Sequence, residues 1–98
     1  MSAVLAGAQL LDQVQPTWFR DVDEDSLAVS DPWRCVLGQV FGYYSVGLRR
    51  LNITRNSAHE YGFNARPNDY LAGQESQRFL NLKSQWKIEI EKRLAAAA

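Results

Sequence analysis

Few residues in this chain are of types that could bind a metal ion or catalyse a reaction, and their spacing limits which of these roles is possible. Asp21, Asp23 and Asp25 alternate as in the first half of a calcium-binding loop. Such a loop needs a glycine at its sixth position and a bidentate acid at its twelfth, where this chain has Ser26 and Pro32. The spacing therefore predicts an exposed, mobile acidic loop that binds no metal ion.

The single cysteine and the single histidine are the remaining candidates for nucleophilic catalysis or zinc binding. Cys35 and His59 lie more than twenty positions apart, and no known spacing rule joins them. His59 and Glu60 lack the second histidine of a zinc protease helix. We therefore expect no enzymatic activity, no metal and no cofactor, and we expect Cys35 to be a buried small apolar side chain.

A surface for a partner is the candidate site that the sequence supports best. Arginine and tyrosine are enriched at protein interfaces, and several remain once the periodic apolar positions are assigned to the core. These residues are Gln39, Tyr43, Arg50, Arg55 and Arg66, with Tyr61 as a further candidate. The alternative, which the pattern leaves open, is that they are ordinary solvated residues.

The element that must carry much of this surface is the most apolar stretch of the chain. From Trp33 onward its large apolar residues recur at i, i+3, i+4 and i+7, which places them on one helical face. Asp31 is an N-cap candidate, and Pro32 suits the first helical position. We predict a central helix over about 32–51, in which Trp33 is buried and small residues around Gly38 let another backbone approach closely.

Three further helices are predicted from capping residues and apolar periodicity: about 2–14, 56–61 and 72–95. Ser2 caps the first of them, and Gly62 ends the second. Trp18 and Phe19 lie between helices and should anchor their segment to the core. The predicted apolar stripe of the last helix consists of Phe79, Leu82, Trp86, Ile90 and Leu94.

These elements predict an all-α fold, a compact helical bundle around the central helix. At 98 residues the chain is long enough for one domain, which we place at 1–94. The alanines at 95–98 either continue the last helix or are a remnant of cloning. A hydrophobic content of 46%, with three tryptophans, argues against disorder.

The charge of the chain is balanced overall but divided unevenly along it. The formal net charge is zero, which gives no overall field to attract nucleic acid or an anionic membrane. Residues 1–31 contain six acidic residues and a single arginine, so the remainder is basic. We expect the acidic segment to lie near basic positions of the later helices. A dipolar surface that meets a partner is the alternative.

Sequence features also indicate the compartment. No apolar run approaches the roughly 20 residues that span a bilayer, and no secretory signal is recognisable. A single cysteine cannot form an internal disulfide. We therefore expect no membrane association and a cytoplasmic location.

Several short motifs together resemble one family. They are Gly7-Ala8-x-Leu10-Leu11-Asp12, Pro16-x-Trp18, Cys35-Val36-Leu37-Gly38-Gln39-x-Phe41-Gly42-x-Tyr44, Gly47-Leu48, Gly62-Phe63 and Trp86-x-Ile88. In these motifs the chain resembles a family of small, mostly uncharacterised proteins encoded by bacteriophages and prophages of actinobacteria. The family supplies no catalytic residue. The resemblance implies a phage protein in the host cytoplasm that acts by binding a host factor.

The expected function is accordingly a non-enzymatic interaction with a host or phage protein, with a homodimer as a further option. The alternative is a small nucleic-acid-binding or regulatory protein, in which arginines contact phosphates and tyrosines stack on bases. The arginines behind this alternative are Arg49, Arg50, Arg55 and Arg66. Nucleic acid is not the expected partner, because arginines near a helix C-terminus are also what the helix dipole favours.

Overall fold

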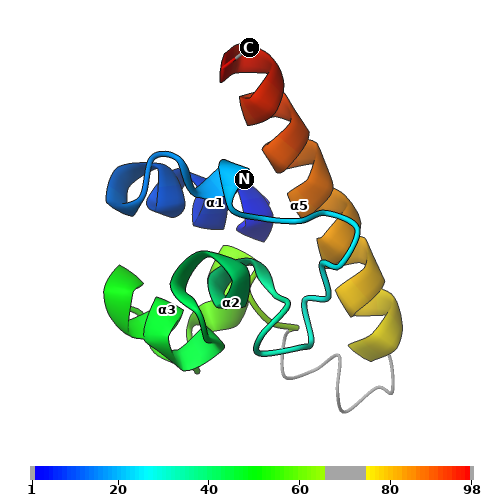
Figure 1. Cartoon of the computed structure of the whole chain (residues 1–98). Coiled ribbons are helices and arrows are strands. Elements are labelled where there is room, and N and C mark those ends of the chain that lie inside the picture. The colour runs from blue at the N-terminus through cyan, green and yellow to red at the C-terminus, as the bar shows by residue number, and fades with distance from the viewer. Residues whose placement is uncertain (1, 66–74, 98) are drawn as a thin grey trace.

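The computed structural model describes residues 2–65 and 75–97, which form helices joined by turns (Figure 1). The α-helices are α1 (Ala3–Val14), α2 (Val36–Phe41), α3 (Tyr44–Leu51) and α5 (Glu75–Ala97), and the 3-10 helices are η1 (Trp18–Arg20) and η2 (Ala58–Tyr61). No strand occurs within the described residues. The predicted all-α class is confirmed.

Helix α1 follows its sequence signals closely. The Ser2 hydroxyl accepts a hydrogen bond from the backbone N–H of Leu5 at 3.1 Å and so caps the helix start. The helix ends just before Pro16, because a proline disfavours the helical conformation of the residue that precedes it. The buried face consists of Val4, Gly7, Ala8 and Leu11. This i, i+3, i+4, i+7 pattern confirms the predicted helix.

The segment 32–51 is not the single central helix that the periodicity predicts. Gly42 ends α2 with φ of 95°, in the left-handed region, and its N–H donates to the carbonyl of Gly38 at 2.9 Å. Tyr43 is extended, and α3 begins at the next residue. The prediction was wrong here because the apolar spacing continues across a glycine that turns the chain.

The start of this segment also differs from the prediction. Asp31 does cap a turn, since its Oδ1 accepts from the N–H groups of Trp33 at 2.8 Å and Arg34 at 3.0 Å. That turn is not continued, and Cys35 becomes the N-cap of α2. Trp33 therefore lies outside the helix and is 64% exposed, which corrects its predicted burial.

Two glycines determine how this region folds on itself. A Cβ on Gly38 would collide with the carbonyl oxygens of Pro32 and Trp33, the second at 2.6 Å. A Cβ on Gly47 would lie 2.7 Å from the Cβ of Leu37, so Gly47 lets α3 fold onto α2. Close approach does occur, as predicted, but at Gly38 the partner is the preceding turn and not another helix.

The centre of the molecule belongs to α1 and α5. Helix α1 contacts α3, α5 and η2, and Figure 1 shows it beside the middle of α5. Trp86 of α5 is fully buried, and its Nε1 donates to the carbonyl of Gly62 at 2.7 Å. Its ring meets Trp18 edge-on at 5.6 Å and stacks on Phe63 at 5.3 Å. Trp18 is thus the core anchor that the sequence predicts, whereas the centre does not lie in 32–51.

The C-terminal part of the chain agrees with the predicted helices apart from their bounds. Helix η2 is a 3-10 helix that ends at Gly62, with φ of 73°. Residues 95–97 continue α5, whereas the predicted start at 72–74 lies outside the described residues. Leu82, Trp86 and Ile90 are buried as predicted, but Leu94 is 38% exposed.

Candidate functional site

An open cavity of about 390 Å³ lies where the turn before α2 meets the start of α3 and the segments around residues 55 and 63. We call it the Tyr43 cavity. The lining residues that matter below are Asp31, Pro32, Tyr43, Tyr44, Arg55 and Phe63. Its volume is within the range of protein sites that bind small molecules or partner side chains.

The break between α2 and α3 creates one wall of this cavity. Because Gly42 turns the chain, the extended Tyr43 leaves the helical path and lies against Trp33, with ring centroids 4.5 Å apart in an edge-to-face arrangement. Tyr43 is half-buried and lines the cavity, whereas Trp33 is largely exposed. The break therefore produces an aromatic pair at the surface.

Another part of the lining combines a cation with apolar groups. The guanidinium of Arg55 lies 6.0 Å from the centroid of the Tyr44 ring, within the range of a cation–π contact. Arg55 is exposed, and among the described residues no carboxylate lies within ion-pair distance of it. Phe63 is buried against Trp86. The cavity thus offers apolar surface next to an available positive charge.

Cys35 also lines the cavity, but its thiol has a structural role. The side chain is 3% exposed, which confirms the predicted burial, and its Sγ accepts from the N–H of Gly38 at 3.3 Å. Burial raises the pKa of the Cys35 thiol. The thiol therefore stays protonated at neutral pH and caps α2, a role that the sequence analysis did not anticipate.

The structure separates the residues predicted to form one partner surface. Tyr43 and Arg55 both line the Tyr43 cavity. Arg50 is exposed and lies over the ring of Phe41, with 5.4 Å from its guanidinium carbon to the centroid. Arg66 lies outside the described residues.

Gln39 is occupied within the chain. Its side-chain oxygen accepts from the N–H of Asp23 at 2.6 Å, and its Nε2 donates to the carbonyls of Asp23 at 3.3 Å and Arg34 at 2.9 Å. Gln39 therefore holds the acidic loop against α2, so its amide is already satisfied by intramolecular hydrogen bonds.

Trp33 and Arg34 are the surface residues that sequence reasoning missed. Both are exposed, and both belong to the turn that Asp31 caps. The signal that could have revealed them is Cys35, a residue able to cap a helix three positions before Gly38. Because the periodicity extends back to Trp33, it concealed this later helix start.

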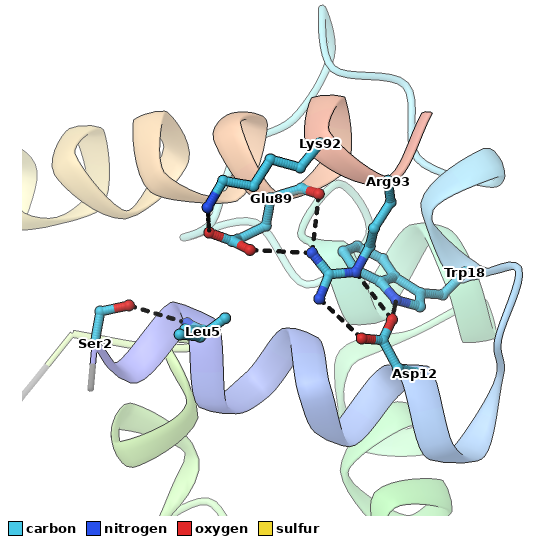
Figure 2. Close-up of polar contacts among 7 residues, drawn as sticks. All are labelled: Ser2, Leu5, Asp12, Trp18, Glu89, Lys92 and Arg93. Carbon is cyan, nitrogen blue, oxygen red and sulfur yellow. Dashed lines mark hydrogen bonds and ion pairs between the residues drawn. The ribbon is translucent and has the colours of Figure 1, made fainter. Parts of the chain in front are cut away.

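A second polar cluster joins the two ends of the chain (Figure 2). Asp12 Oδ1 accepts from Trp18 Nε1 and from Arg93 Nε, each at 2.9 Å, and Asp12 Oδ2 accepts from Arg93 at 2.8 Å. Arg93 also pairs with Glu89, four positions earlier on α5, at 3.0 Å. The arginine hydrogen bonds lower the pKa of Asp12 against the opposing effect of its burial. These residues satisfy one another, which marks the cluster as structural.

The acidic loop meets the last helix at Glu24. Burial raises the pKa of Glu24, and the nearby Glu91 raises it further, whereas Lys87 lowers it. The acidic first third therefore contacts both acidic and basic positions of α5, and the expected charge pairing holds at Asp12 with Arg93.

No group of three metal-ligating side chains is arranged to hold a metal ion within the part of the chain that the structure describes.

Among the described helices, none has the length and apolar character needed to cross a bilayer. No protein-family model, curated protein or solved structure matches this chain.

Proposed function

We propose that this protein is a non-enzymatic phage protein that binds another protein, of the host or of the phage, in the host cytoplasm. The observation that carries the proposal is Trp33, which is 64% exposed and held edge-to-face against Tyr43 beside an open cavity. Tryptophan, tyrosine and arginine dominate the binding energy of protein interfaces. Pre-ordered aromatic rings also lose little conformational entropy when a partner covers them.

The residues around this pair suit the rim of an interface. Arg34 directly follows Trp33, and Arg55 lines the cavity together with Tyr43; both arginines are exposed. Polar and charged side chains around a buried aromatic centre are the usual arrangement of such surfaces. The phage context comes from the motif resemblance.

Nucleic acid binding is the second candidate, favoured by the same exposed arginines. Within the described residues Arg49, Arg50 and Arg55 have no carboxylate within ion-pair distance, so they are available for phosphates. Trp33 and Tyr43 could stack on bases. The zero net charge of the chain weighs against this reading.

The test is quantitative capture from an actinobacterial lysate, using the wild type, Trp33→Ala and Ile88→Ala. Ile88 is 52% exposed on α5 and provides a matched control for removing an exposed apolar side chain. We expect one protein at stoichiometric recovery with the wild type and the control. Loss of a hot-spot tryptophan should weaken its binding by about 2 kcal/mol or more, measured by calorimetry with the purified partner.

Two results would count against this function. Equal affinity of Trp33→Ala and the wild type for the captured protein would show that Trp33 is not in the interface. Recovery that is sensitive to nuclease and falls steeply with salt would favour the nucleic acid reading. Circular dichroism should show that both variants keep the wild-type helix content, because both side chains are exposed.

A further inference from the structure

We propose that the Tyr43 cavity binds an apolar side chain from an acidic segment of the protein partner, with Arg55 contacting a carboxylate of that segment. This inference rests on the proposed function and adds the chemistry of the partner to it. The structural basis is the juxtaposition, in one open cavity, of aromatic walls from Tyr43, Tyr44 and Phe63 with the exposed guanidinium of Arg55.

The aromatic walls of the Tyr43 cavity favour the binding of an apolar side chain. Tyr43 is fixed by its edge-to-face contact with Trp33, and Phe63 by stacking on the buried Trp86. Pro32 contributes a further apolar surface. Walls that are already held by their own packing need no rearrangement when a side chain enters, which lowers the entropic cost of binding.

The positive charge of Arg55 favours acidic residues next to that apolar side chain. Asp31 is the acidic residue among the described lining residues, and its Oδ1 already accepts two backbone N–H groups of the turn. Arg55 has neither a carboxylate within ion-pair distance nor a hydrogen-bond acceptor for its guanidinium among the described residues. Arg34, whose backbone N–H donates to Asp31 in the same turn, is a further exposed positive charge. Charge complementarity therefore favours an acidic segment over a neutral or basic one.

A compact test uses three probes of the same shape and different charge: 3-phenylpropionate, 3-phenylpropanamide and 3-phenylpropylamine. Each is titrated into the isotope-labelled full chain, and binding is followed by chemical shifts. We expect the anion to bind best and the amine worst, with the largest shifts at Tyr43, Tyr44 and Arg55. Arg55→Gln should weaken the anion about threefold to tenfold and leave the amide unchanged.

Arg49→Gln is the matched control, because Arg49 is an exposed arginine of α3 that does not line the cavity. We expect the anion to bind this variant within about twofold of the wild type, since a distant exposed charge is screened. Equal binding of all three probes, or an equal loss in both variants, would overturn the assignment of Arg55.

The captured partner provides the direct test. Overlapping peptides that cover its sequence are titrated against the wild type and Arg55→Gln, and an acidic peptide that binds about threefold to tenfold more weakly to the variant supports the proposal. If Trp33→Ala abolishes capture while no acidic peptide and no probe binds the cavity, the proposed function stands and this inference is wrong. An oligothymidine that binds through Arg55 when 3-phenylpropionate does not would assign the arginine to nucleic acid instead.

Discussion

Asp12 links α1 to Trp18 and to Arg93 near the end of α5. It is in α1, yet both of its oxygens accept hydrogen bonds from Arg93 near the end of α5, and one also accepts from Trp18. Charge-assisted bonds in a partly buried place are stronger than exposed ion pairs. Removing Asp12 leaves Trp18 Nε1 and Arg93 Nε without the acceptor that they share.

We expect Asp12→Ala to lower the free energy of unfolding by about 2 kcal/mol, because it leaves Trp18 Nε1 and the Nε of Arg93 without their acceptor. Denaturant unfolding followed by circular dichroism measures this. Asp21→Ala, which removes an exposed carboxylate, is the control and should change the free energy by less than about 0.5 kcal/mol. Equal effects of the two variants would show that the cluster in Figure 2 adds no stability.

Glu24 makes the stability of the folded protein depend on pH. The folded pKa of Glu24 lies above its ordinary value of 4.5, first because of burial and then because of Glu91. The folded state therefore holds the proton more tightly than the unfolded state. The stability that this provides is present below the ordinary value and is lost as pH rises through the folded pKa.

We expect Glu24→Gln to raise Tm relative to the wild type near neutral pH and to leave it unchanged at about pH 3.5, where both states are protonated. Asp12→Asn should behave differently. The folded pKa of Asp12 lies below its ordinary value of 3.8, so the stability from Asp12 is present at neutral pH and is lost as pH falls through the folded pKa. A Tm gain for Glu24→Gln that is the same at both pH values would contradict this assignment.

At the scale of elements, the break between α2 and α3 decides the form of the candidate site. Gly42 has φ of 95°, and nothing lies near the position its Cβ would take, so its conformation and not its size makes glycine suitable there. The N–H of Tyr44 donates to the carbonyl of Pro32 at 2.9 Å, which ties the start of α3 to the turn before α2. This tie brings Tyr43 and Trp33 together.

We expect Gly42→Ala to lower the free energy of unfolding by about 1 kcal/mol or more, because an L side chain is strained at this φ. Gly42→Asn should cost less, since asparagine tolerates the left-handed region better. Thermal unfolding measures both. If 32–51 were instead a continuous helix, Gly42→Ala would stabilise the protein by about 1 kcal/mol, so the sign of the change decides between the two structures.

At the scale of the whole molecule, Trp86 joins segments from both ends of the sequence. Its ring contacts Trp18 and Phe63, and its Nε1 hydrogen bond reaches Gly62. Gly7 lies so close that an added Cβ would be 3.1 Å from this ring. A single side chain of α5 thus holds α1, η1 and the end of η2 in place.

We expect Trp86→Phe to lower the free energy of unfolding by about 2 kcal/mol, because it leaves a cavity and an unpaired carbonyl at Gly62. Trp33→Phe is the control and should change it by less than about 0.5 kcal/mol, since Trp33 is exposed. Denaturant midpoints compare the two. A Trp86 effect no larger than the Trp33 effect would show that the core is centred elsewhere.

The sequence by itself determined the all-α class, the cap of α1 at Ser2, the end of η2 at Gly62 and the buried stripe of α5 through Trp86. These features depend on local signals, namely a capping hydroxyl, a glycine and a 3.6-residue period. Each acts between residues a few positions apart. Such signals can be read without knowing the rest of the fold.

Only the tertiary structure decided the break at Gly42, the exposure of Trp33 and the meeting of Tyr43 with Arg55 in one cavity. Local periodicity favours one continuous helix over 32–51, and contacts between distant segments override it. Asp12 and Arg93 show the same limit, because no pattern in the sequence joins residues that lie 81 positions apart. Part of the core could therefore be predicted from the sequence, whereas the arrangement of the candidate site could be seen only in the folded chain.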